Sequence, residues 1–338
     1  MGELVDRRSF IATGLGLAAG LAARSSRWPL RGSPVGGAPE AIGAEAAGFK
    51  TWLKKALIVN RPTEDELKRL GDAGYQGVEA GVLDVEQATA CRAAAEKAGM
   101  KIHSVLRGWA EFNSSDPGKC QSSFEQTEKA LLAAQAFGAD AVLLVPCRIG
   151  GMSMPRPWEF HIDFDPETNH IRTVTVGDNA PFAEYIRAHN HAIDTSREAV
   201  KRLIPVAEKT GVAIALENVW NNLWVRPAIF KHFVESFKSP WVQAYFDIGN
   251  HVKYAPPEEW ILALGGLLAK CHVKDFKLDL ADPDGGGTWA RIREGSVRWP
   301  VVRSALERVG YSGWMTIEDD KLSIEEHSRR LDLIIAGK

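Results

Sequence analysis

The stretch Val212-Ala213-Ile214-Ala215-Leu216-Glu217 is a short apolar run that ends in a carboxylate, and Ala244-Tyr245-Phe246-Asp247 repeats this pattern. Runs of this length and composition are typical of strands that are buried on both faces of a parallel sheet. A polar residue that ends such a strand lies at the carboxyl edge, where barrels of alternating strands and helices carry their chemistry. The two segments therefore predict a parallel sheet with functional carboxylates at one edge.

Six further runs of the same kind extend the pattern in both directions along the chain. The expected strands are 56–60, 77–80, 101–106, 141–146, 213–217, 243–247, 270–274 and 314–318. Amphipathic stretches lie between them, and those expected to be helices include 63–73, 85–98, 123–137, 195–209 and 300–309. Eight strand and helix units favour a closed (β/α)8 TIM barrel over an open doubly wound sheet. We expect residues 49–338 to form this one domain.

One interval interrupts the alternation, because some 45 residues separate Pro146 from the helix expected near Thr195. Long loops without secondary structure are uncommon in compact domains. Residues 158–164 and 170–176 alternate apolar and polar side chains around a turn at 165–169, which predicts a β-hairpin. We expect this insertion, at about 150–190, to be a lid over the barrel mouth or a contact in a homo-oligomer.

The first 48 residues have the features of an export signal rather than of the barrel. Asp6-Arg7-Arg8-Ser9-Phe10-Ile11 precedes a weakly apolar stretch rich in Ala and Gly, and resembles a twin-arginine signal. The apolar part is about half as long as the roughly 20 residues that span a bilayer, so we expect no stable membrane anchor. Cleavage within the linker at 32–48 would release the protein into the periplasm or the medium.

Composition and charge exclude several classes of protein. The chain has 338 residues, 45% hydrophobic, with 41 basic and 43 acidic side chains. These values exclude a disordered chain, and the lack of a basic run argues against a nucleic-acid partner. The four cysteines are widely spaced and form no metal-binding or disulfide pattern, so we expect mostly buried thiols, with one disulfide left open.

Four of the expected strands end in a side chain that can bind a metal: Glu217, Asp247, His272 and Glu318. Any one of them alone is as easily a helix cap, an ion-pair partner or a structural histidine. Together they close four consecutive strands, and three carboxylates crowded at one edge would repel one another without a cation. This oxygen-rich set predicts a site for a divalent metal, Mn²⁺ first, with Mg²⁺ or Co²⁺ as alternatives.

The motifs around these residues resemble those of the xylose isomerase-like TIM barrel superfamily. They are Leu216-Glu217-Asn218-Val219-Trp220-Asn221-Asn222, Tyr245-Phe246-Asp247-Ile248-Gly249-Asn250, His272-Val273-Lys274-Asp275, Gly295-Ser296-Val297-Arg298-Trp299-Pro300 and Gly310-Tyr311-Ser312-Gly313-Trp314, followed by Glu318. Within this superfamily the likeness is greatest to sugar-phosphate isomerases and epimerases, including ketose 3-epimerases and L-xylulose 5-phosphate 3-epimerase. The resemblance implies that the four residues bind the metal and that Glu217 and Glu318 exchange protons with a sugar through an enediolate.

The chain differs from many members of the superfamily that it resembles, which carry a histidine three residues after the metal aspartate, where this chain has Asn250 followed by His251. Asn250 can donate a hydrogen bond but cannot titrate. An exported enzyme would also meet free sugars, glycosides or oxidised glycosides more readily than sugar phosphates. Further residues expected to bind the substrate are Glu79, Arg107, Trp109, Asn218, Trp220, Asn250, His251 and Lys274.

The sequence thus predicts a metal-dependent sugar isomerase or epimerase with a small carbohydrate as its partner. Two alternatives stay open: a lyase that uses the same metal site on keto-sugars or keto-glycosides, and a barrel that binds carbohydrate without turnover. A multinuclear endonuclease on the same fold would need more histidines at strand ends than the one found here.

Overall fold

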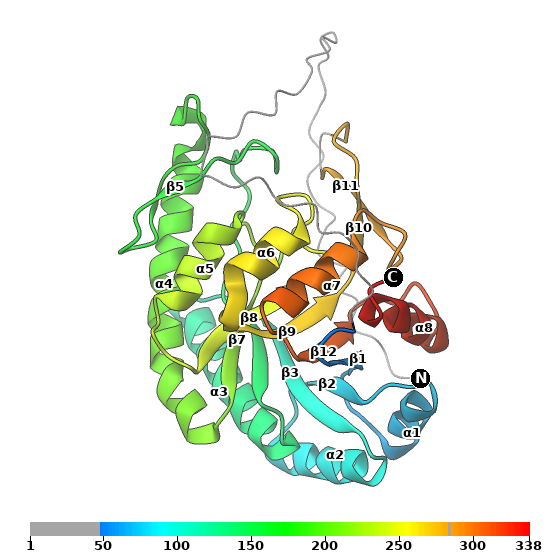
Figure 1. Ribbon diagram of the computed structural model, residues 1–338. Coiled ribbons are helices and arrows are strands. Elements are labelled where there is room, and N and C mark those ends of the chain that lie inside the picture. Colours follow the sequence, from blue (N-terminus) through cyan, green and yellow to red (C-terminus); the bar gives the residue numbers. More distant parts are fainter. Residues whose placement is uncertain (1–47, 283–284) are drawn as a thin grey trace. The chain divides into compact units, whose positions relative to one another are not determined.

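The computed structural model describes residues 48–282 and 285–338. In this part of the chain, eight parallel strands form a closed barrel with the neighbour order β1-β12-β9-β8-β7-β4-β3-β2. Figure 1 shows the strands inside the ring of helices. The strands are β1 (Leu53–Val59), β2 (Gly77–Gly81), β3 (Lys101–Trp109), β4 (Ala141–Val145), β7 (Ala213–Glu217), β8 (Val242–Asp247), β9 (Leu268–Val273) and β12 (Gly313–Ile317). Pairing of β1 with β12 closes the barrel. The predicted TIM barrel is confirmed, whereas the predicted leader lies outside the described residues.

Eight α-helices of the described chain surround this barrel (Figure 1). They are α1 (Glu64–Asp72), α2 (Val85–Lys97), α3 (Pro117–Phe137), α4 (Ala183–Thr210), α5 (Pro227–Glu235), α6 (Pro257–Leu264), α7 (Trp299–Arg308) and α8 (Ile324–Ile335). Local sequence sets several boundaries: Thr63, Asp84 and Ser323 cap the amino ends of α1, α2 and α8 through their side chains. Gly138 and Gly211 end α3 and α4 with positive φ angles.

Two elements are longer than the sequence predicts. Strand β3 continues to Trp109 instead of ending at Leu106, with an irregularity in its register with β4 between Leu106 and Gly108. Helix α4 begins at Ala183, well before the expected start near Thr195. Tyr185 and His189 in its first part are completely buried. Tertiary packing of this first part explains why the local pattern placed the helix start too late.

The predicted insertion after β4 contains an antiparallel hairpin of β5 (Asp163–Phe164) and β6 (Ile171–Thr173). The hairpin lies along α4, where the Ile171 backbone N–H donates to Asn190 Oδ1 at 2.8 Å. Trp158, which precedes this hairpin, lies close to Gly286. A Cβ added at Gly286 would come within 3.2 Å of the Trp158 ring.

A second hairpin, which the sequence analysis did not predict, follows β9 directly. Strands β10 (Asp275–Leu278) and β11 (Gly287–Ala290) pair antiparallel between β9 and α7. The buried Asp275 carboxylate anchors its base, accepting hydrogen bonds from the backbone of Arg293 and Val297 and from the Trp299 indole. This hairpin extends the carboxyl end of β9.

All four cysteines are free, and Cys91, Cys147 and Cys271 are buried, which confirms the expectation of buried thiols. No helix within the described residues is long and apolar enough to span a membrane.

Candidate metal centre

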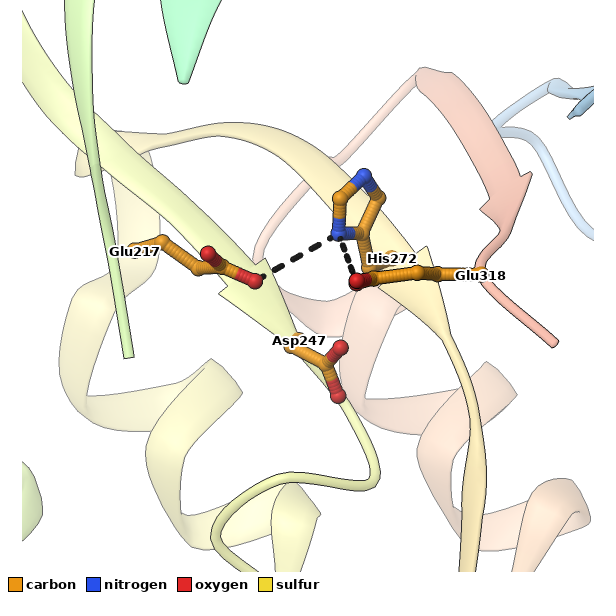
Figure 2. Close-up of side chains that lie close together, drawn as sticks. All are labelled: Glu217, Asp247, His272 and Glu318. Carbon is orange, nitrogen blue, oxygen red and sulfur yellow. Dashed lines mark ion pairs between the residues drawn. The ribbon is translucent and has the colours of Figure 1, made fainter. Parts of the chain in front are cut away.

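The four predicted ligands meet at the carboxyl ends of four adjacent strands. Glu217 ends β7, Asp247 ends β8, His272 lies near the end of β9, and Glu318 follows β12. Each offers one ligand atom, and these atoms lie within 4.8 Å of one another. Figure 2 shows Glu217 and Glu318 approaching a common centre from opposite sides, with Asp247 and His272 between them. The sequence prediction that these side chains converge is therefore correct.

A tight turn after β8 fixes Asp247. Its Oδ1 accepts hydrogen bonds from the backbone N–H groups of Gly249 and Asn250, both at 2.8 Å. The side chain of Asn218 forms two hydrogen bonds with the Asp247 backbone, donating to the carbonyl at 2.9 Å and accepting from the N–H at 2.7 Å. One carboxylate oxygen is thus engaged in the turn, while Oδ2 is directed to the cluster.

His272 presents one ring nitrogen to two glutamates of the cluster and the other nitrogen to a third glutamate, Glu79. Nδ1 lies 2.8 Å from Glu318 Oε2 and 3.5 Å from Glu217 Oε1. Nε2 lies 2.5 Å from Oε2 of Glu79, on the opposite side of the ring. The nitrogen that faces the cluster is therefore Nδ1.

The electrostatics of the cluster favour a bound cation. Burial raises the pKa of Asp247, although the Lys274 charge opposes this rise. Burial alone would lower the pKa of His272, but the Glu79 and Glu318 carboxylates outweigh it and raise the pKa well above the usual value. Asp247 Oδ2 lies 3.3 Å from the Lys274 ammonium, whereas within the described chain neither oxygen of Glu217 accepts a hydrogen bond. Buried carboxylates without donors are costly unless a cation compensates them.

The residues present therefore fit a divalent metal ion, since three carboxylates and one imidazole form an oxygen-rich set. The ligand side chains are almost completely buried, which limits competition from solvent. A proton and a metal ion would compete for His272 Nδ1, so binding is expected to weaken at low pH.

Lys274 borders the cluster on the carboxylate side. Its Nζ lies 2.9 Å from Glu318 Oε2 and 3.3 Å from Asp247 Oδ2, and it donates to Asn250 Oδ1 at 3.4 Å. Asn250 in turn donates to the Asn218 carbonyl at 3.0 Å. The structure thus places Asn218, Asn250 and Lys274, all expected to bind substrate, next to the ligands.

Three other residues expected at the substrate make structural contacts. Arg107 and Trp109 lie within β3 and not after it. The guanidinium of Arg107 donates to Thr127 Oγ1 and to the backbone carbonyl of Trp109. Trp109 packs against the side chain of Arg148, which lies 5.2 Å from its ring centre. His251 is 2% exposed and lies 3.0 Å from the Val219 carbonyl. Burial lowers its pKa to about 3, so it is a neutral packed histidine.

An aromatic wall, formed by Trp220 and Trp289, lies beside Lys274. The two indoles stack with ring centres 5.0 Å apart, and Lys274 Nζ lies 5.4 Å from the Trp289 ring. Lys253 Nζ lies 3.5 Å from the Trp220 ring. Sequence reasoning placed Trp220 near the substrate but missed Trp289. The signal was the 46-residue separation between His272 and Glu318, which leaves room for an additional hairpin after β9.

Comparisons with known proteins agree with this fold. The profile of the xylose isomerase-like TIM barrel family matches residues 67–333, whereas no curated protein sequence matches significantly. A xylose isomerase domain protein from Planctomyces limnophilus superposes with a TM-score of 0.61 at 16% identity, over 85% of this chain and 97% of its own.

Two further solved structures are similar at this distance. A D-tagatose 3-epimerase-like protein has a TM-score of 0.62 at 16% identity, over 83% of this chain and 98% of its own. A 3-keto-D-glucoside 4-epimerase from E. coli has a TM-score of 0.60 at 14% identity, over 83% and 98%. These likenesses concern the fold, and the family match covers most of the chain. The chain belongs to the xylose isomerase-like TIM barrel family.

Proposed function

We propose that the protein is a divalent-metal-dependent sugar isomerase or epimerase that removes a proton from the carbon next to a carbonyl. The observation that carries this proposal is the arrangement of Glu217 and Glu318 on opposite sides of one buried ligand cluster. A divalent cation, for which we propose Mn²⁺ first, would be held by Glu217, Asp247, His272 and Glu318. It would polarise the carbonyl of the sugar. The similarity to solved sugar epimerases supports the substrate class.

The two glutamates would divide the proton transfer between them. One carboxylate takes the proton from the carbon, and the other returns a proton to the opposite face, which inverts that carbon. Return of the proton to the neighbouring carbon would instead interconvert an aldose and a ketose. Lys274, which pairs with Asp247 and Glu318, would donate a hydrogen bond to a sugar oxygen. The wall of Trp220 and Trp289 would lie against the apolar face of the sugar ring or chain.

Product analysis in D₂O tests this proposal. The Mn²⁺-loaded protein is incubated with ketoses and with 3-keto-glycosides, and the products are examined by NMR and mass spectrometry. We expect an epimer or an aldose–ketose isomer that carries solvent deuterium at the reacting carbon. Loss of water or of an aglycone would instead establish the lyase alternative. Sugar-dependent thermal stabilisation without any product would establish a binding barrel.

We also propose that the protein is exported by a twin-arginine signal within residues 1–48, of which 1–47 lie outside the described residues. The adjacent Arg7 and Arg8 support this proposal. Cell fractionation should find the wild-type protein in the periplasm or the medium, and the Arg7→Lys/Arg8→Lys double variant inside the cell. Equal distribution of the two proteins would contradict export by this route.

A further inference from the structure

A series of buried, hydrogen-bonded polar side chains lies on the side of His272 that faces away from the ligand cluster. Glu79 on β2 is completely buried, and its Oε2 lies 2.5 Å from His272 Nε2. In the barrel, β12 and β1 separate β2 from β9, so this contact crosses the barrel interior. The proton transfers proposed above do not use Glu79.

Other buried side chains hold Glu79 in this position. Ser104 Oγ donates to Glu79 Oε1 at 3.2 Å and lies 2.9 Å from His103 Nδ1. His103 Nε2 lies 3.0 Å from Thr316 Oγ1, and the His103 ring stacks on Trp314 with centres 4.5 Å apart. Both Glu79 oxygens are therefore engaged, and the carboxylate has no freedom to turn toward the barrel mouth.

The contact determines which nitrogen of His272 can bind a metal. Glu318 also faces Nδ1, at 2.8 Å, so a metal that binds Nδ1 would replace the proton there, and the Glu79 carboxylate at Nε2 would hold the one proton that a neutral imidazole keeps. The lone pair of Nδ1 then faces Glu217, Asp247 and Glu318. A carboxylate behind a ligating histidine also raises the basicity of the ligand and fixes the orientation of the ring.

We propose that Glu79 is a positioning residue that holds His272 in the Nε2–H tautomer and thereby sets the affinity of the centre for a divalent metal. The proposal rests on the proposed metal-dependent function, which it deepens. It also assigns Glu79 a place behind the metal ligand, in contrast to the direct contact with substrate that the sequence suggests. The two roles differ in what they control: the metal affinity in one case, and the KM for the sugar in the other.

Two substitutions separate the effect of the Glu79 charge from the effect of its hydrogen-bond acceptor. Glu79→Gln keeps the size of the side chain and an oxygen that accepts from His272 Nε2, but removes the negative charge. Glu79→Leu removes the acceptor as well. Partners of ligating histidines typically contribute about 10- to 100-fold to metal affinity, so we expect the Kd for Mn²⁺ to rise roughly tenfold in Glu79→Gln and roughly 100-fold in Glu79→Leu.

The measurement is calorimetric titration of each purified, metal-free protein with Mn²⁺, with unfolding curves to show that each variant is folded. Glu258→Gln is the matched control, because Glu258 is also buried but pairs with Arg298 on another part of the barrel. We expect its Kd to equal that of the wild type. If Glu79→Leu fails to fold, Glu79→Gln alone tests the proposal through its expected tenfold change.

The outcomes distinguish this proposal from the proposed function. A wild-type Kd in the folded Glu79 variants would overturn the positioning role and leave the metal-dependent function standing. An unchanged Kd with a raised KM for the sugar would overturn it in favour of direct substrate contact. A wild-type protein that binds no divalent metal would overturn both proposals.

Discussion

Glu217 and Glu318 face each other across the ligand cluster, so their carboxylates are the groups whose charge the proposed reaction requires. Glu217→Gln and Glu318→Gln keep the side-chain size but remove the base. We expect each change to lower turnover by at least about 100-fold, because positioned acid–base groups typically contribute this much. The measurement is the initial rate at saturating Mn²⁺, together with exchange of the substrate C–H for deuterium.

Glu96→Gln provides the control for these substitutions, because Glu96 is exposed and pairs with Arg92 on the surface of α2. Its turnover should equal that of the wild type. Near-normal turnover of either site variant, when fully loaded with metal, would refute the assignment of two catalytic bases.

His189 makes the stability of the protein depend on pH. Its ring is 1% exposed, Nε2 lies 2.8 Å from the Leu223 carbonyl, and burial lowers its pKa to about 4. The unfolded chain, with a pKa near 6.5, takes up a proton more readily than the folded chain. The stabilisation is therefore complete above pH 6.5 and is lost as the pH falls toward 4. Between pH 8 and pH 5 we expect a loss of about 2 kcal/mol from this group.

Urea unfolding at several pH values measures this effect. His189→Gln keeps an N–H donor for the Leu223 carbonyl but does not titrate in this range. Its free energy of unfolding should fall less steeply with decreasing pH than that of the wild type. The difference in slope should correspond to the uptake of about one proton on unfolding. An identical slope in the two proteins would contradict the assignment to His189.

Among the elements, the turn after β8 depends on a close approach to the end of β9. A Cβ at Gly249 would lie 2.7 Å from Cβ of Lys274, and the same turn supplies both donors to Asp247 Oδ1. Gly249→Ala should push the turn away, cost about 1–3 kcal/mol of stability, and weaken Mn²⁺ binding. Thermal unfolding and metal titration check both effects. Gly266→Ala is the control, because nothing lies within 4 Å of the added carbon.

The hairpin of β10 and β11 brings an indole to the site. Trp289 is 36% exposed, stacks on Trp220 and lies near Lys274, while its carbonyl accepts a hydrogen bond from Lys321 at 2.6 Å. We expect Trp289→Ala to raise the KM for the sugar roughly fivefold, which corresponds to about 1 kcal/mol of lost contact. The exposed Trp52, just before β1, is the matched control. A KM unchanged by Trp289→Ala would exclude the hairpin from the substrate site.

For the molecule as a whole, metal binding should be coupled to folding, because the four ligands come from four strands of the barrel. Mn²⁺ at 100 times its Kd should stabilise the fold by about 2.7 kcal/mol and raise the Tm by roughly 5 °C. EDTA should reverse the shift, as differential scanning calorimetry would show. The Tm of the Glu217→Gln protein should rise less with Mn²⁺. A wild-type Tm that does not change with divalent metals would contradict the proposed metal centre.

The sequence alone was sufficient to predict the barrel and the positions of its ligands. Glu217, Asp247 and Glu318 end apolar runs, and in a parallel barrel such ends must gather at one edge. The order of the elements and the hairpin after β4 also follow from local patterns of apolar residues, turns and caps. These features depend on neighbouring residues in the chain, so a sequence read in short windows contains them.

Only the tertiary structure decided the contacts between segments distant in sequence. Glu79 is 193 residues from His272, and no local pattern indicates that the two side chains meet inside the barrel. The hairpin that positions Trp289 depends on the buried Asp275, whose partners lie up to 24 residues away. His251 looks like a site residue in the sequence but packs into the core. Local periodicity determined which residues face inward, whereas closure of the barrel determined which of them touch.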